Sequence, residues 1–256
     1  MKTALELIEI SYSYSDGTRA LDNIGFRVES GDCLGLVGPS GAGKSTLGNC
    51  LIGACLPQSG KIFVDGMEVN RKNLAEIRKK VGYIFQNPDD QLFMPTLFDD
   101  VAFGLVERGV DGDELNERVA KALKDRGLEK LANKFPGHLS GGQKRLAALA
   151  GVLVMEPEVL ILDEPSSNLD PRSRRNLINQ LGELKNTRIV TGHDLEMVLD
   201  LCNRVLLLRE GALVADGDPR VVLADKELME RTGLEVPHSL NTSRHTHRIA
   251  SHKHEL

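Results

Sequence analysis

The sequence predicts an α/β fold in which a mixed β-sheet core, with an antiparallel β part, carries an inserted lobe of α-helices. Three observations support this prediction. A strand over residues 34–37 runs straight into a glycine-rich turn and then into a helix over 45–53. A helical stretch follows over about 96–155, and after Pro157 strands and helices alternate again. Such alternation indicates a parallel sheet with helices on both faces.

The elements are expected in a definite order along the chain. Short apolar runs bounded by turn residues predict strands at 5–10, 34–37, 61–64, 81–85, 159–162 and 188–190. Helical patterns and their start signals predict helices at 45–53, 98–107, 113–126, 142–155, 171–184 and 195–201. A hairpin over 205–208 and 212–215 is expected at the sheet edge, and residues 87–95 read as a polar loop.

We expect one domain over residues 1–236, with the helical lobe over about 96–155 inserted in it, and a flexible tail over 237–256. No motif is repeated, so a single catalytic cassette is expected. The tail has little apolar content and holds five histidines: His238, His245, His247, His252 and His254. These imidazoles would suit Ni²⁺ or Co²⁺. Solvated polar residues, or partly an artefact of cloning, remain the alternative.

Composition excludes several classes of protein. Hydrophobic residues make up 41% and charged residues 27%, which excludes a disordered or fibrous chain. A net charge of −5 gives no basis for general binding to nucleic acid. No apolar run approaches the roughly 18 residues needed to cross a bilayer, and the first ten residues are too short and acidic for a signal peptide. Any link to a membrane should come through another chain. The four cysteines lack a CxxC spacing and read as reduced thiols that fill the core: Cys33, Cys50, Cys55 and Cys202.

Residues 38–46 read GPSGAGKST, directly after a strand and at the start of a helix. This is the pattern of a phosphate-binding loop, in which glycines let the backbone amides point at phosphates beside the positive end of a helix dipole. Lys44 adds a positive charge, and Ser45 supplies a hydroxyl to Mg²⁺. The expected nucleotide contacts are Gly38, Pro39, Ser40, Gly41, Ala42, Gly43, Lys44, Ser45 and Thr46.

Two carboxylates, Asp163 and Glu164, follow the strand at 159–162. Parallel sheets place their ligands at this carboxyl edge. Asp163 can hold Mg²⁺ through its water shell, and Glu164 can polarise the water that attacks a γ-phosphate. Together with the phosphate loop, the pair predicts a P-loop NTPase with a RecA-like core that uses ATP and Mg²⁺.

Residues 139–143 read LSGGQ and lead into a helix, where a serine and two glycine amides make a second anion site. With this motif the chain resembles ABC-type ATPases. The resemblance implies that ATP is held between the Lys44 loop of one subunit and the Ser140 loop of a second, in a two-fold dimer. The second loop comprises Ser140, Gly141, Gly142 and Gln143. A homodimer is expected, and a heterodimer stays open.

The resemblance covers about residues 5–233 and implies further roles. Tyr14 matches the aromatic residue that stacks on adenine, Gln86 the glutamine at the joint between lobes, and Asp170 the aspartate of the loop that crosses the dimer interface. His193 matches the switch histidine. The implied catalytic residues are Lys44, Gln86, Glu164 and His193, and the implied Mg²⁺ ligands are Ser45, Gln86 and Asp163.

Two departures from the family pattern occur beside these residues. Residues 165–171 read PSSNLDP, where many relatives have threonine and glycine at two places, and Gly192 stands where a threonine is common. Neither removes a reacting group, so a competent site is expected.

Residues 81–104, VGYIFQNPDDQLFMPTLFDDVAFG, look like the ATPases of energy-coupling-factor importers, especially the cobalt and nickel uptake branch. The implied partners are an integral membrane coupling subunit and a membrane protein that captures the substrate, which would place the chain at the cytoplasmic face of the membrane. An apolar groove that could seat a basic amphipathic helix is expected from Phe93, Met94, Leu97 and Phe98, rimmed by Asp89, Asp90, Asp99 and Asp100. The alternative is that these apolar groups pack the helical lobe.

Two other functions remain open. The same motor would serve a transporter of a vitamin such as biotin, because the capture protein carries the specificity. A soluble ABC ATPase that acts on ribosomes or DNA repair substrates is the second alternative, but such relatives usually carry paired cassettes or a long coiled-coil insertion.

Overall fold

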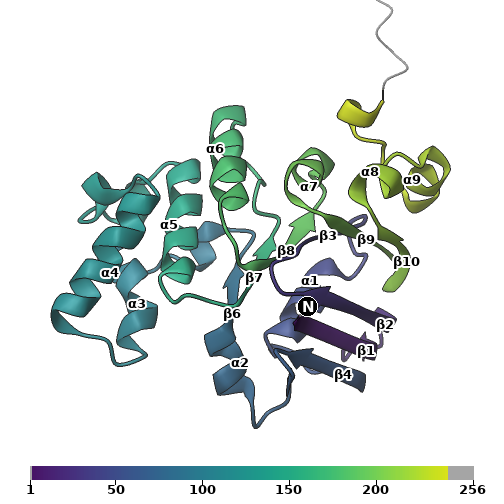
Figure 1. The fold of residues 1–256 in the computed structure, drawn as a ribbon, viewed down its shortest axis with the longest axis horizontal. Coiled ribbons are helices and arrows are strands. Elements are labelled where there is room, and N and C mark those ends of the chain that lie inside the picture. The colour runs from purple at the N-terminus through teal and green to yellow at the C-terminus, as the bar shows by residue number, and fades with distance from the viewer. Residues whose placement is uncertain (1, 242–256) are drawn as a thin grey trace, which may run out of the picture.

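The computed structural model describes residues 2–241 and contains two β-sheets (Figure 1). The larger sheet has the strand order β10-β9-β3-β8-β7-β6, and the smaller has the order β2-β1-β4-β5. The strands are β1 (Thr3–Ser13), β2 (Arg19–Glu29), β3 (Cys33–Val37), β4 (Ser59–Val64), β5 (Met67–Glu68), β6 (Val81–Ile84), β7 (Val159–Asp163), β8 (Thr187–Gly192), β9 (Arg204–Arg209) and β10 (Ala212–Gly217).

Several helices begin where a short polar side chain accepts a hydrogen bond from a backbone amide of the first turn, as Thr96 and Asp170 do. The α-helices are α1 (Lys44–Leu51), α2 (Leu74–Lys80), α3 (Leu97–Val106), α4 (Gly112–Asp125), α5 (Gly141–Leu153), α6 (Pro171–Gly182), α7 (Leu195–Leu201), α8 (Pro219–Val222) and α9 (Lys226–Thr232). The 3-10 turns are η1 (Pro88–Asp90), η2 (Glu129–Leu131), η3 (Pro136–His138) and η4 (His238–Leu240).

The three central strands β3, β8 and β7 run parallel and are buried along their whole length. Continuous apolar strands of this kind lie between two covering layers. Their registers pair Val37 with Gly192 and Asp163 with Thr191. The loops that follow these strands therefore open at one edge of the sheet.

Each face of the larger sheet has its own core. Leu34 and Leu36 of β3 pack against the smaller sheet and α1, whereas Leu160 and Leu162 of β7 belong to the core formed with α3, α5, α6 and α7. Figure 1 shows α3, α4 and α5 gathered at one side of the molecule, beyond β6. The hairpin β9-β10 is antiparallel and closes the opposite edge. The predicted mixed sheet with an antiparallel part is thus confirmed.

The sequence pattern did not predict β2, β5, α2, α8 or α9. The pairing of β2 with β1 contains several register shifts, and Asn23 has a positive φ of 50°. The apolar residues of β2 therefore do not alternate cleanly, which hides the strand from a period-two search. Strand β5 has two residues and helix α8 has four, which is too short to display a period.

Residues 237–241, the start of the predicted tail, include η4, in which the amide of Ser239 donates to Oε1 of Glu196 at 3.0 Å. Leu240 packs against the core. The tail histidines at 245, 247, 252 and 254 lie outside the described residues, so the tail assignment stays a prediction. Within residues 2–241, no helix has the length and apolar character needed to cross a membrane.

Candidate functional site

The phosphate loop joins β3 to α1 and depends on glycine at two points. Gly43 has a φ of 103°, and a Cβ placed there would lie 2.4 Å from the carbonyl oxygen of Ala20. A Cβ at Gly38 would lie 2.3 Å from the carbonyl oxygen of Leu208. Only glycine fits such close backbone approaches. The strand-turn-helix context that the motif requires is therefore present.

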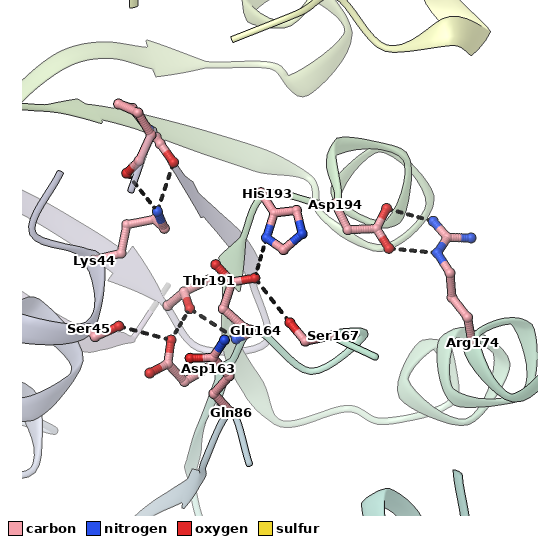
Figure 2. Close-up of polar contacts among 12 residues, drawn as sticks. Lys44, Ser45, Gln86, Asp163, Glu164, Ser167, Arg174, Thr191, His193 and Asp194 are labelled. Carbon is pink, nitrogen blue, oxygen red and sulfur yellow. Dashed lines mark hydrogen bonds and ion pairs between the residues drawn. The ribbon is translucent and has the colours of Figure 1, made fainter. Parts of the chain in front are cut away.

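Lys44 folds back into this loop. Its Nζ donates to the carbonyl oxygens of Gly38 at 2.7 Å and Pro39 at 3.0 Å, and the residue is only 8% exposed (Figure 2). Burial lowers the pKa of the Lys44 ammonium, although the negative charges of Glu164 and Asp163 act to raise it. An incoming phosphate would supply the negative charge that this buried ammonium lacks at contact distance.

The Asp163 carboxylate, at the end of β7, accepts hydrogen bonds from three hydroxyl groups. Its Oδ1 accepts from Thr191 at 2.5 Å and from Ser45 at 3.4 Å (Figure 2). Its Oδ2 accepts from Tyr83 at 2.9 Å. Tyr83 and Thr191 were not predicted as site residues. Each is a polar residue near the carboxyl end of a buried parallel strand, which is the signal that could have identified them.

Glu164 turns out of the strand with a positive φ of 46°. Its Oε2 accepts from Nδ1 of His193 at 2.5 Å and from the hydroxyl of Ser167 at 3.3 Å (Figure 2). The His193 side chain is 71% exposed, whereas that of Glu164 is 15% exposed. His193 is therefore exposed to solvent, whereas the Glu164 carboxylate that it contacts is mostly buried.

This contact constrains the imidazole. If Nδ1 carries the proton that Glu164 accepts, a neutral ring leaves Nε2 as an acceptor. In this geometry a neutral His193 therefore cannot also donate from Nε2 to a γ-phosphate. Donation from Nε2 requires the protonated ring or rotation of His193 away from Glu164.

Gln86 stands at the end of β6 with an exposed side chain. Its backbone is fixed from α5: the buried guanidinium of Arg145 donates to the carbonyl oxygens of Phe85 at 2.7 Å and Gln86 at 2.6 Å. Arg145 was not predicted as a site residue, because a single arginine in an Ala- and Leu-rich helix carries no local signal.

Ser140 begins α5 with a reciprocal capping box. Its Oγ accepts from the amide of Gln143 at 3.3 Å, and the Gln143 side chain accepts from the amide of Ser140 at 3.0 Å. Gly141 lines a cavity with Gln86 and Ser167, whereas residues 39–42 of the phosphate loop line a different cavity. The two predicted nucleotide loops thus line separate cavities of this chain.

Tyr14 is exposed over 45% of its surface, and its hydroxyl is 2.7 Å from Oγ1 of Thr46. Its ring meets that of Tyr12 edge-on, with centroids 5.2 Å apart. Asp170 begins α6 and accepts from the amides of Arg172 and Ser173 at 3.0 Å. The structure brings five predicted site residues together at the carboxyl edge of the sheet: Lys44, Ser45, Asp163, Glu164 and His193 (Figure 2). Tyr14 contacts the phosphate-loop helix through Thr46.

The expected apolar groove needs correction. Leu97 is fully buried and Phe98 packs against the core, so these two residues fill the helical lobe. The Asp99 carboxylate accepts from the Thr96 hydroxyl at 2.6 Å, and the Asp100 carboxylate accepts from the amides of Phe93 and Met94, so neither forms a free rim. In this segment and on α3, the large apolar side chains that remain exposed are Phe93, at 62% exposure, Phe103 and Val106. The rings of Phe93 and Phe103 meet edge-on at 5.1 Å.

Comparison with known proteins agrees with this geometry. Residues 21–167 match the ABC transporter family model. A putative ABC transporter ATP-binding protein of Gloeobacter violaceus is 50% identical over 234 residues, which cover 91% of this chain and 96% of that protein. The energy-coupling factor transporter ATP-binding protein EcfA of Methanothermobacter thermautotrophicus is 44% identical over 238 residues, covering 91% and 76%.

Two solved structures share the fold. The first is cbiO1 from Clostridium perfringens, described as part of the ABC transporter complex cbiONQ, with a TM-score of 0.81, 39% identity and coverage of 94% of this chain and 99% of that one. The second is a dimeric ATP-binding cassette in a post-hydrolysis state with ADP and phosphate, with a TM-score of 0.75, 26% identity and coverage of 84% and 98%. The predicted fold class is confirmed, and the chain belongs to the ABC transporter ATP-binding family, whose members hydrolyse ATP to power transport.

Proposed function

We propose that this chain is the ATP-hydrolysing subunit of an energy-coupling-factor type importer and works as a two-fold dimer at the cytoplasmic face of a membrane. The observation that carries the proposal is the contact between Glu164 and His193 at 2.5 Å, beside the Lys44 loop and the linked pair of Ser45 and Asp163. In this arrangement a candidate general base, Glu164, lies beside the loop that would bind the phosphates of ATP.

The donor set fits Mg²⁺. The Ser45 hydroxyl and the Asp163 carboxylate are hard oxygen ligands 3.4 Å apart, and this ion prefers such oxygens together with phosphate and water. Tyr83 and Thr191 orient the carboxylate through their hydroxyls. When bound, the ion would neutralise charge that develops on the β- and γ-phosphates. Gln86 is proposed as a further ligand at the end of β6.

Glu164 is the proposed base for the attacking water. It takes one proton from the water as the water oxygen bonds to the γ-phosphorus and the bond to the β-phosphate oxygen breaks. His193 and Ser167 fix Oε2, so that Oε1 faces the water. When ATP binds, the Lys44 ammonium would leave the carbonyl oxygens of Gly38 and Pro39 and donate to phosphate oxygens. The charge-assisted bonds to phosphate compensate for the two bonds that are lost.

The dimer is proposed because the phosphate loop and the Ser140 loop line different cavities of the described chain. Ser140 and Gly141 are exposed at the start of α5, a helix of 13 residues whose free amides form an anion site. A second copy would complete the site with this helix end, leaving two equivalent sites in a homodimer.

The surface of Phe93, Phe103 and Val106 is the proposed contact for the membrane partner. These side chains form an exposed apolar patch: Phe93 follows Gln86 closely in sequence, and Phe103 and Val106 lie on α3. Such a patch suits the apolar face of a coupling helix. The proposed cargo is a divalent metal ion such as cobalt or nickel, because residues 81–104 resemble that branch and the fold resembles cbiO1.

Substitution Glu164→Gln tests the base. The variant should bind ATP and form a stable ATP-dependent dimer on size exclusion, while phosphate release falls by about 10²- to 10⁴-fold. Glu183→Gln, on the exposed end of α6, is the matched control and should hydrolyse normally. Phosphate release by Glu164→Gln at the wild-type rate would sink the assignment.

Mixing two inactive variants tests the shared site. Lys44→Ala removes the phosphate-loop charge, and Gly141→Asp blocks the second loop at a position where a side chain meets no neighbour within 4 Å. A mixed dimer holds one site with both defects and one intact site, so hydrolysis should return on mixing. A mixture as inactive as its components would contradict a site built from two copies.

Co-expression with candidate membrane subunits tests the partner. Phe93→Asp should abolish co-purification with the coupling subunit and leave basal hydrolysis intact. Val221→Asp, an equally exposed apolar position on α8, is the control. Uptake of labelled Co²⁺ or Ni²⁺ by the assembled complex tests the proposed cargo. Uptake of biotin, without uptake of either metal ion, would show that the cargo is a vitamin instead.

A further inference from the structure

Two cysteine thiols meet at the end of the phosphate-loop helix. The Sγ atoms of Cys50 and Cys55 lie 3.3 Å apart, and both residues are free thiols. Cys50 is fully buried in the last turn of α1, whereas Cys55 is half-buried in the turn that follows. The expectation that all four cysteines only fill the core does not account for this pair.

The contact gives the two thiols different reactivity. The hydrogen bond between the two sulfurs lowers the pKa of the Cys55 thiol, against its partial burial. The same contact, with burial, raises the pKa of Cys50. Because the thiolate is the nucleophile, Cys55 is the thiol that an oxidant reaches and reacts with first. Cys50 stands at contact distance to resolve the product.

The pair is linked to the nucleotide loop through Thr46. The Cys55 sulfur lies 3.9 Å from the Thr46 carbonyl oxygen, and the Thr46 hydroxyl is 2.7 Å from that of Tyr14. Cys55 and Tyr12 pack against the same core cluster, and the Tyr12 ring supports Tyr14 edge-on. Thr46 is therefore the direct link between the Cys55 sulfur and Tyr14.

We propose that Cys50 and Cys55 form a peroxide-sensitive dithiol whose oxidation to a disulfide weakens ATP binding. Hydrogen peroxide oxidises the Cys55 thiol to a sulfenic acid and is reduced to water. The Cys50 sulfur then attacks the Cys55 sulfur, a second water leaves, and the disulfide forms. Two thiols and one peroxide thus give one disulfide and two waters, and a dithiol reductant reverses the change. The consequence for ATP rests on the proposed nucleotide site.

The expected direction follows from the distances. A disulfide needs its sulfurs about 2.05 Å apart, so the two must approach by about 1.2 Å. Cys50 is enclosed in the core, so Cys55 makes most of this movement and leaves the Thr46 carbonyl. The link from Thr46 to Tyr14 is then disturbed, and the affinity for ATP should fall several-fold.

The other cysteine pair is a matched control. Cys33 and Cys202 have sulfurs 3.6 Å apart, and hydrogen bonding from Cys202 lowers the pKa of Cys33 to about 7. Both are buried in the core, away from Thr46. If access decides reactivity, hydrogen peroxide should bridge the first pair and spare the second.

The test uses the full chain, hydrogen peroxide and a fluorescent ATP analogue with Mg²⁺. Peptide mass analysis of the oxidised protein should find the bridge between Cys50 and Cys55, and analogue binding should weaken several-fold and recover with dithiothreitol. Cys55→Ala should abolish the response, and the Cys33→Ala/Cys202→Ala variant should retain it. The wild-type mass analysis is decisive even if a variant fails to fold.

Three results would overturn the inference: a bridge at Cys33 and Cys202 instead, over-oxidation of Cys55 without a bridge, or a bridge between Cys50 and Cys55 with unchanged analogue affinity. If the reduced protein does not bind the analogue, the proposed function fails, while the mass analysis still decides whether the dithiol is oxidised.

Discussion

Arg174 holds the carboxylate of Asp194 with two parallel hydrogen bonds, from Nε at 2.6 Å and Nη2 at 2.7 Å (Figure 2). Asp194 directly follows His193 and also begins α7, where it accepts from the amide of Met197 at 3.1 Å. Arg174 lies in the first turns of α6, which Asp170 caps. The loop proposed to cross the dimer interface is therefore tied to the loop that carries His193.

Substitution Arg174→Ala should release the His193 loop. The pair is mostly sheltered, with side chains 24% and 20% exposed, and a bidentate charge-assisted contact of this kind is worth about 1 to 3 kcal/mol. Urea unfolding should show that loss. Steady-state kinetics should show kcat falling more than KM rises, because Arg174 does not touch the nucleotide directly. Arg175→Ala breaks an exposed pair with Asp200 on the same helix and should cost less than about 1 kcal/mol.

The stability difference should depend on pH. Burial raises the pKa of Asp194, but hydrogen bonds from Arg174 and the Met197 amide outweigh it and hold the pKa below its ordinary value of 3.8. A lowered folded pKa stabilises the protein above that ordinary value, and the stabilisation is lost as the pH falls through the folded pKa. The gap between wild type and Arg174→Ala should therefore be full above about pH 4 and shrink below it. A gap that is constant down to pH 2 would contradict the role of the ion pair.

Tyr83→Phe should lower the apparent affinity of the hydrolysis site for Mg²⁺ without changing the fold. The variant removes one of three hydroxyl donors to Asp163 and keeps the aromatic ring. Groups that orient a metal ligand typically contribute about 10- to 100-fold in metal affinity. Titration of activity with Mg²⁺ should show a higher half-saturating concentration. Thr191→Ser retains its hydroxyl and should be close to wild type, and equal effects in both variants would count against orientation of Asp163.

The parts of the site that the sequence revealed are those encoded by contiguous residues. Residues 38–46 and 139–143 each carry their chemistry within one loop, so spacing alone was sufficient. Tyr83 meets Asp163 across 80 positions and Arg145 reaches Phe85 across 60, and such contacts depend on strand order that no local pattern encodes.

The same limit explains the groove. Leu97 and Phe93 are both large, apolar and close in sequence. Their burial differs because Leu97 opens α3 towards α5 while Phe93 precedes that helix. Only tertiary packing separates the buried Leu97 from the exposed Phe93.

Gly43→Ala should damage the protein more than Gly41→Ala. Both positions have positive φ, 103° and 79°, so each alanine costs about 1 kcal/mol of backbone strain. At Gly41 the new methyl meets nothing within 4 Å, whereas at Gly43 it would lie 2.4 Å from the Ala20 carbonyl oxygen. The free energy of unfolding should fall by about 1 kcal/mol in the first variant and by about 3 kcal/mol or more in the second. Equal losses would show that the loop relaxes away from β2.

Arg145→Ala should uncouple the Gln86 loop from α5. The guanidinium is buried, its burial lowers its pKa, and its donors satisfy the carbonyl oxygens of Phe85 and Gln86. Removing it leaves two carbonyl groups without these partners, which should cost about 2 to 4 kcal/mol on urea unfolding.

Arg145→Lys separates charge from geometry, because a single ammonium cannot reproduce two guanidinium contacts with separate nitrogens. It should recover part of the stability of Arg145→Ala but little of the stimulation of hydrolysis by the membrane partner, which is proposed to contact the adjacent surface. Lys144→Ala, which breaks only the exposed contact with Asp89, is the neighbouring control and should change stability by less than about 1 kcal/mol. Full stimulation in Arg145→Lys would show that a positive charge alone fixes the Gln86 loop.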